Sequence, residues 1–215
     1  MNGVQICYFE TGEQFRADGT ILLIHATGFH ARCWDRTIQL LCGRHVVAID
    51  MRGHGRSGKV GPFTWDVFGA DVADFVAILD LDNILAAGHS FGGHSLCQAV
   101  SKVGDRFQRA LLVDPVILSP ENYARSETQR HAWLNEQDEH PVARRRNHFD
   151  SVQAMYDNYH GKGSFASWQE DVLWDYCRFG CLADDEGVTL ACPPKVEAAI
   201  YQGSSDCDIH TLIRE

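Results

Sequence analysis

From residue 20 onward, short apolar runs alternate along the chain with stretches of helical periodicity. The apolar runs have the length and composition of buried parallel strands, and they cover 20–26, 45–51, 83–88 and 109–117. The stretches between them predict helices at 33–43, 64–81 and 91–104. This alternation predicts an α/β fold, with a mostly parallel, doubly wound sheet covered by helices on both faces. Residues 2–19 instead predict a β-hairpin that leads into the sheet.

The pattern changes after Ile117. Helical spacing continues from about 119 to 200, and no further apolar run in that segment predicts a buried strand. The segment is rich in aromatic residues, namely Trp133, Phe149, Tyr156, Tyr159, Trp168, Trp174 and Tyr176. Taken singly, each of these rings is expected to pack inside its own layer, because large rings dominate protein cores. We therefore expect a core region at 1–118 and a helical cap region at 119–215.

Composition favours a single globular enzyme-sized domain. The chain has 215 residues, of which 45% are apolar and 22% are charged. No run approaches the ~18 apolar residues of a membrane span, and the opening MNGVQICYFETGEQ has no basic region followed by an apolar one, so no export signal is predicted. We expect a cytoplasmic protein.

The balance of charge excludes two classes of partner. With 19 basic and 29 acidic residues the formal net charge is −10, which repels nucleic acid and anionic membrane surfaces. The expected partner is a small-molecule substrate. One basic cluster, Arg144, Arg145 and Arg146, is expected to be a solvated helix face, with anion binding or packing of the cap as the alternatives.

The eight cysteines do not predict a metal site. They are scattered without C-x-x-C pairs, as in a reducing compartment. Cys177 and Cys181 lie four residues apart, but no second ligand pair accompanies them, so both are interpreted as small buried residues. No metal and no cofactor is expected.

Residues 86–95, AAGHSFGGHS, match G-x-S-x-G at the end of an apolar run and the start of a helical one. A strand that turns abruptly into a helix strains the residue at the turn, and its neighbours must be nearly free of side chains. Gly88, Gly92 and Gly93 meet that demand around Ser90. The Ser90 hydroxyl is then lifted clear of the sheet as a nucleophile, and the amide of Phe91 points to where negative charge develops.

Four segments together resemble the α/β-hydrolase fold in its cap-bearing branch. They are LLIHATGFHARCW, AIDMRGHGRSG, GHSFGG and LLVDPV, and the resemblance covers about residues 20–118. It implies a serine nucleophile at Ser90 and oxyanion donors at the amides of Thr27 and Phe91. Ala26 stands where the family usually has glycine, and Gly28 is expected to supply the lost backbone freedom. The resemblance also implies that His54 holds loops together rather than reacting.

The same resemblance implies a triad in the chain order serine, acid, histidine. Asp114 ends the strand after the one that carries Ser90, a place from which some members supply the acid; an equal alternative is that it caps the loop before Pro115. His210 is the sole histidine after His160 and lies near the C-terminus, His89 is expected to point away from the hydroxyl, and His94 follows on the helix. We expect the catalytic histidine and two strands of the usual sheet to be missing from this chain.

A serine at the turn predicts acyl transfer, since the alkyl-ester chemistry of related aspartate enzymes has no serine equivalent. The expected function is hydrolysis of an ester, thioester, lactone or activated C–C bond in a small, largely apolar substrate enclosed by the cap. Two alternatives stay open. One is a non-catalytic member that binds a ligand, and the other is an inactive fragment.

Overall fold

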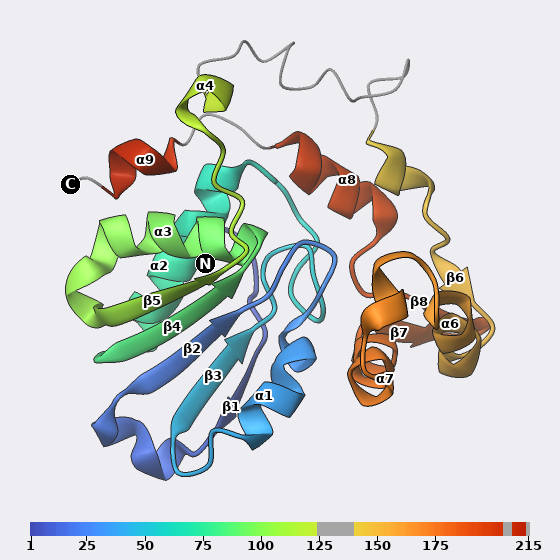
Figure 1. Cartoon of the computed structure of the whole chain (residues 1–215), viewed down its shortest axis with the longest axis horizontal. Helices are drawn as coiled ribbons and strands as arrows, with labels where there is room; N and C mark the ends of the chain where they lie inside the picture. Colours follow the sequence, from blue (N-terminus) through green and yellow to red (C-terminus); the bar gives the residue numbers. More distant parts are fainter. Residues whose placement is uncertain (124–139, 204–207, 214–215) are drawn as a thin grey trace.

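The computed structural model describes residues 1–123, 140–203 and 208–213, so Trp133 lies outside the described residues. Its centre is a five-stranded sheet in the order β1-β3-β2-β4-β5 (Figure 1). The strands are β1 (Tyr8–Thr11), β2 (Thr20–Ile24), β3 (His45–Ile49), β4 (Ile84–His89) and β5 (Phe107–Val113). Strands β2 to β5 pair in parallel, and β1 pairs antiparallel with β3. The mostly parallel α/β sheet predicted from the alternating pattern is confirmed.

The hairpin expected at residues 2–19 is wrong. Only β1 is a strand, and it pairs with β3 rather than with a sequence neighbour. It is followed by a 3-10 helix, η1 (Glu13–Asp18). The turn between them is Gly12, with φ 70° and a backbone so close to Arg44 that a Cβ would lie 2.1 Å from the Arg44 carbonyl oxygen. Gly12 therefore packs its backbone against the residue that precedes β3.

Helices cover both faces of the sheet. On one face, α2 (Trp65–Ile78) and α3 (Phe91–Val103) pack over a core that includes Leu22, Val47 and Phe68. On the other, η2 (Ala31–Trp34) and α1 (Asp35–Gln39) pack over Leu23, Val46 and Ala48. The helix expected at 33–43 thus divides into a 3-10 turn and a short α-helix that ends before Gly43. A further 3-10 turn, η3 (Gly104–Arg106), precedes β5.

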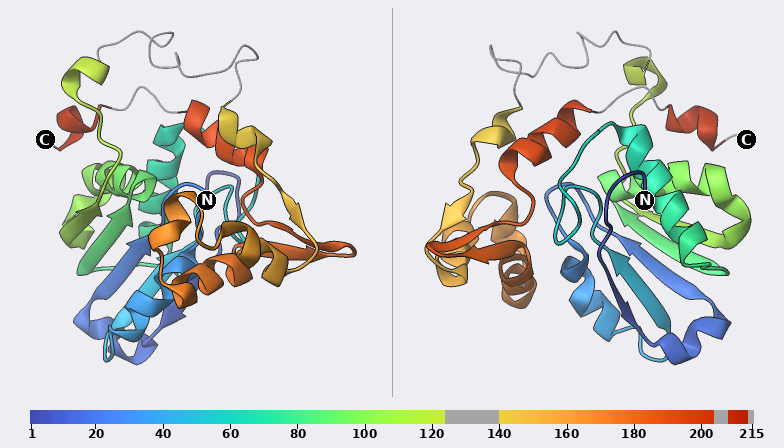
Figure 2. Two further views of the ribbon diagram at one scale, coloured as in Figure 1. Left: turned by 45° about the vertical axis from the view of Figure 1, so that its right-hand side comes forward. Right: turned by 180° about the vertical axis from the view of Figure 1, so that it is seen from behind.

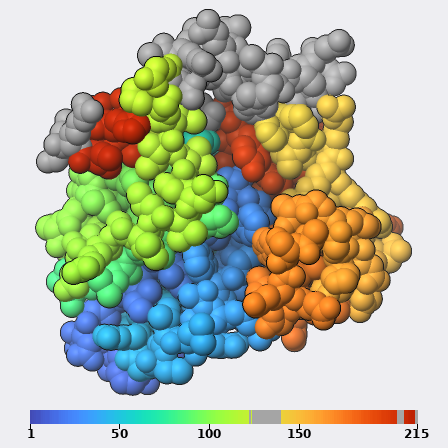
Figure 3. Space-filling model, viewed as in Figure 1, coloured from blue at the N-terminus to red at the C-terminus, as the bar shows by residue number. Residues whose placement is uncertain are grey.

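The sheet face on which α1 packs is uncovered at its β5 edge, as the space-filling view shows (Figure 3). β4 and β5 are in register there, with Ala87 opposite Leu111 and His89 opposite Val113. Leu85 is 39% exposed, Leu111 62% and Val113 40%. Parallel strands are usually covered on both faces, so this exposed apolar face is unusual for the fold.

The region after β5 contains helices and a small antiparallel sheet in the order β6-β8-β7. Figure 2 shows this sheet beside α6 and α7, away from the five-stranded sheet. Its helices are α4 (Pro120–Tyr123), η4 (Pro141–Arg144), α6 (Val152–Tyr159), η5 (Gly163–Ser167), α7 (Glu170–Phe179), α8 (Pro194–Gln202) and α9 (Ile209–Leu212), and its strands are β6 (His148–Phe149), β7 (Cys181–Asp184) and β8 (Gly187–Leu190). The expectation of no strand in this segment is wrong.

The small sheet escaped the sequence pattern for a physical reason. Its strands have two to four residues, and Leu182, Ala183 and Asp184 of β7 are exposed, so no apolar run marks them. The aromatic residues Phe149, Tyr156, Tyr159 and Tyr176 form a second buried core with Leu173 and Leu190. Most of the rings expected to pack within this region therefore do so.

Candidate active site

Ser90 occupies the turn between β4 and α3. Its φ is 53° and its ψ is −118°, a conformation that a non-glycine residue rarely adopts. The Ser90 amide donates to the Val113 carbonyl at 2.9 Å, and the Ser90 carbonyl accepts from the amides of Gly93 and Val116 at 3.0 and 3.1 Å. The strand, strained turn and helix predicted around this serine are all present.

The glycines around Ser90 are required by close backbone packing. A Cβ at Gly92 would lie 2.5 Å from the carbonyl oxygen of His25, and one at Gly88 would lie 2.6 Å from that of Gly92. Side chains at these positions would separate β4 from α3 and α3 from the loop after β2. The glycines of the motif are therefore needed for close packing of β4, α3 and the loop after β2. Ser90 itself lies at the carboxyl edge of the sheet.

Two buried histidines hold the loop that contains Ala26, Thr27 and Gly28. The His25 Nε2 accepts from the Met51 amide at 2.9 Å, and its Nδ1 donates to the Ala26 carbonyl at 2.8 Å. The His54 Nε2 accepts from the Gly28 amide at 3.0 Å, and its Nδ1 donates to the Arg52 carbonyl at 2.8 Å. Burial lowers the pKa of both imidazoles, so both are neutral at pH 7. His54 thus joins two loops, as the family resemblance implied.

Gly28 takes the conformation that Ala26 cannot provide. Its φ is 77°, whereas Ala26 is fully packed and 3% exposed. A Cβ at Gly28 would lie 2.5 Å from the Oε1 of Glu197 on α8. The loop after β2 is therefore in direct contact with the helix that follows the small sheet.

Arg145 is not part of a solvated face, so the expectation for the arginine cluster is wrong at this position. Its Nη1 donates to the Glu197 Oε2 at 3.1 Å, its Nη2 to the Tyr159 hydroxyl at 2.9 Å, and Nη2 also to the Tyr176 hydroxyl. Arg144 and Arg146 are exposed. Helical periodicity could not single out Arg145, because its partners come from α6, α7 and α8.

Glu197 is a residue that sequence reasoning missed. It is 5% exposed, and burial raises the pKa of its carboxyl group while Arg145 opposes that rise. The available signal was a single acidic residue inside the apolar helical stretch VEAAI. A lone charge among apolar neighbours on a helix favours a buried ion pair.

Asp114 lies at the same sheet edge as Ser90. It directly follows β5, has φ 44° and is exposed. Its charge opposes the lowering of the His89 pKa that burial causes, so the carboxylate and the imidazole are near neighbours. This placement is compatible with both hypotheses for Asp114, the triad acid and the residue that caps the loop.

No histidine hydrogen-bonds to the Ser90 hydroxyl within the described part of the chain. His210 is bonded through Nε2 to the Leu118 carbonyl at 2.9 Å. His94 is buried against Trp65 with its Nδ1 on the Val116 carbonyl at 2.9 Å, and burial lowers its pKa to about 4. His89 packs against Phe29, at 6.0 Å between ring centroids.

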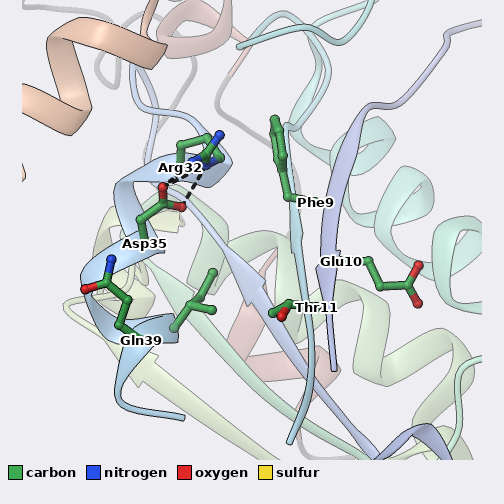
Figure 4. A pocket seen from close by; sticks show the side chains of 7 residues that line it. Phe9, Glu10, Thr11, Arg32, Asp35 and Gln39 are labelled. Carbon is green, nitrogen blue, oxygen red and sulfur yellow. Dashed lines mark hydrogen bonds and ion pairs between the residues drawn. The ribbon is translucent and has the colours of Figure 1, made fainter. Parts of the chain in front are cut away.

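Other parts of the described chain give no sign of a second reactive site. Cys177 and Cys181 are buried free thiols, and residues 1–123, 140–203 and 208–213 contain no group of three or more side chains suited to a metal ion. Nor do those residues include a helix long and apolar enough to cross a membrane. In a groove of about 310 Å³ lined by β1, η2 and α1, Arg32 forms an ion pair with Asp35 at 2.6 Å (Figure 4). Glu10, which also lines the groove, is hydrogen-bonded to His45 at 2.7 Å.

Comparison with known proteins places this geometry in a family. The chain is 34% identical over 119 residues to a non-heme haloperoxidase of Rhodococcus erythropolis, covering 54% of this chain and 42% of that protein. It is 33% identical over 100 residues to the lipase LipV of Mycobacterium tuberculosis, covering 45% and 37% respectively. The chain thus matches less than half the length of these curated relatives.

The structure of an alpha/beta hydrolase from Novosphingobium aromaticivorans superposes with a TM-score of 0.73 at 18% identity. The match covers 99% of this chain and 74% of that one. The model of the alpha/beta hydrolase family matches residues 21–200, which include β2 to β5, Ser90 and most of the region after the sheet. The chain belongs to the alpha/beta hydrolase family.

Proposed function

We propose that this protein is a serine hydrolase that cleaves an ester, thioester, lactone or activated C–C bond of a small, largely apolar substrate through an acyl-enzyme. The observation that carries the proposal is the conformation of Ser90, with φ 53° at the junction of β4 and α3. A strained serine at this junction exposes its hydroxyl at the sheet edge where α/β enzymes bind their ligands. The name of the related lipase agrees with acyl chemistry.

In this proposal the Ser90 Oγ attacks a carbonyl carbon, and the negative charge moves to the carbonyl oxygen. The amide of Phe91 is the first of α3 and has no partner within the helix, so it is free to donate to that oxygen. The second donor is the amide of Thr27, on the loop that His25 and His54 hold. The positive end of the α3 dipole adds to the stabilisation of the same charge.

A serine hydroxyl also needs a base, which is normally a histidine oriented by a carboxylate. We assign the carboxylate to Asp114, since it is exposed at the end of β5 beside the Ser90 turn. The base is proposed to be a histidine other than His89, His94 and His210. The side chains of the last two are bonded to backbone carbonyls.

The direct test is hydrolysis of p-nitrophenyl acetate, together with labelling of Ser90 by a fluorophosphonate. We expect near-background turnover by the 215-residue chain, because loss of a triad member costs roughly 10⁴ to 10⁶ in turnover. A version extended by further strands and a histidine should hydrolyse the ester. Ser90→Ala should abolish that activity, and Ser101→Ala, a serine at the far end of α3 bonded to the Gln98 carbonyl, should not. An extended version that stays inactive on esters, thioesters and lactones would refute the proposal.

A second candidate is a ligand-binding protein without catalysis. The observation in its favour is that the Ser90 hydroxyl has no hydrogen-bonded base among the described residues. Ser90-dependent turnover by the 215-residue chain itself would exclude this candidate. His210→Ala would then be the first variant to make in a search for the base.

A further inference from the structure

A cavity of about 130 Å³ adjoins the two segments that carry the proposed reacting groups. Ala26 and His89 line it, and they are the immediate neighbours of Thr27 and Ser90. Phe29 and Cys33 line it from the loop and turn after β2, Trp168 from the position that follows η5, and Val172 from α7. The cavity therefore lies where the core and the region after it meet, beside the proposed nucleophile.

The walls of this cavity suit a flat ligand. The rings of Phe29 and Trp168 are nearly parallel, with centroids 5.6 Å apart and planes at 19°. The imidazole of His89 tilts against Phe29 at 55°. Aromatic walls favour planar guests through offset or edge-to-face contact. An apolar cavity of about 150 Å³ is known to accept benzene, so this cavity has the size of a single ring.

Trp34 lines the cavity with a buried Nε1 that has no hydrogen-bond partner among the described residues. A second polar group comes from His89. Its imidazole is half-buried and makes no hydrogen bond to any residue that the structure describes. Burial lowers its pKa, so at pH 7 the ring is neutral and offers one N–H donor and one nitrogen acceptor. The thiol of Cys33 is neutral as well, since burial raises its pKa to about 12. The cavity thus offers hydrogen bonding without a formal charge.

We infer that this cavity binds one planar ring with an uncharged polar substituent, so that the substrates are aryl or heteroaryl esters. Phe29 and Trp168 stack on one another and form a single aromatic wall against which the ring packs, and His89 bonds to its substituent. The assignment of substrates rests on the proposed function of Ser90, whereas binding of the ring requires no reaction.

The test is calorimetric titration of the 215-residue chain with benzamide and with cyclohexanecarboxamide, which has the same amide on a puckered ring. We expect saturable binding of benzamide, at least about tenfold tighter than that of the puckered amide. Phe29→Leu should weaken benzamide binding about three- to tenfold through loss of the aromatic contact. Trp174→Phe is the matched control, because Trp174 stacks on Tyr156 outside the cavity, and it should change nothing.

The role of His89 is tested with His89→Phe, which keeps a ring and removes the hydrogen bonds. It should weaken benzamide binding about three- to tenfold and leave the binding of toluene unchanged. Equal affinity for both amides, or no binding of benzamide by the folded wild-type chain, would overturn the inference. Fluorophosphonate labelling of Ser90 is scored separately, on the version extended by further strands and a histidine. Ring binding without labelling defeats the proposed function alone, and labelling without ring binding defeats the ring site alone.

Discussion

Glu197 on α8 lies against Gly28 in the loop after β2, so closely that a Cβ at Gly28 would be 2.5 Å from the Glu197 Oε1. The carboxylate is held there by Arg145, whose Nη1 lies 3.1 Å from Oε2. Because Gly28 follows Thr27, the contact links the region after β5 to the proposed oxyanion donor. The contribution of this contact to stability can be measured by unfolding variants at Gly28, Arg145 and Glu197.

Gly28→Ala should destabilise the protein through two effects. Its φ of 77° is unfavourable for alanine, at about 1 kcal/mol, and the new methyl group collides with Glu197. We expect a total loss of about 2 to 3 kcal/mol in the free energy of unfolding. Gly43→Ala is the matched control, since Gly43 has φ 73° with nothing within 4 Å of its Cβ position. Equal losses for the two variants in urea unfolding would disprove the contact.

Arg145→Met should cost about 3 kcal/mol, because it leaves the buried Glu197 carboxylate without its counter-ion. Adding Glu197→Gln removes the unpaired charge and should restore part of that loss. The double variant is therefore expected to unfold at a higher urea concentration than Arg145→Met alone. A further loss of stability in the double variant would show that the ion pair has no net role in the burial of Glu197. Arg144→Met, at an exposed neighbour, serves as control.

Stability should fall as the pH is lowered from about 6.5 towards 4. His25, His30, His54 and His94 are buried, and burial lowers the pKa of each, to about 4 for His30 and His94. Below pH 6.5 the unfolded chain binds protons at these rings and the folded chain does not, so the unfolded state is favoured. Each such proton contributes a slope of about 1.4 kcal/mol per pH unit.

Urea unfolding at several pH values measures this slope. Replacing the exposed His160 by glutamine should leave the slope unchanged. His94→Gln should reduce the slope by up to the contribution of one proton, about 1.4 kcal/mol per pH unit. A stability that is flat between pH 6.5 and 4.5 would show that the four rings are not held neutral.

The bare face of β4 and β5 should make the 215-residue chain self-associate. Leu111 and Val113 expose apolar surface beside the outer edge of β5, which pairs with no further strand among the described residues. The free backbone groups of such an edge can pair with the same edge of another chain. Leu111→Lys should shift the protein towards the monomer in light scattering after size exclusion. Ile78→Lys on α2 replaces a side chain that is 65% exposed and should not. A wild-type chain that is monomeric at high concentration would contradict this expectation.

The strands β2 to β5 and the turn at Ser90 were readable from the sequence because their causes are local. A buried strand needs a continuous apolar run, and a strained turn needs small residues immediately around it, as the close contact of Gly88 with Gly92 shows. The prediction of His54 as a bridge between loops also stands.

Tertiary structure decided what depends on partners far along the chain. Arg145 and Glu197 are 52 positions apart, so the apolar neighbours of Glu197 favour a buried partner but do not indicate which cation supplies it. Residues 2–19 contain a turn, but β1 pairs with β3, with Thr11 opposite Val46, rather than with a strand of the same segment. The cavity beside His89 likewise exists because Phe29 and Trp168 meet across the fold. Local periodicity records which side of an element is apolar, whereas burial energy depends on which elements meet, and that is set by packing of the whole chain.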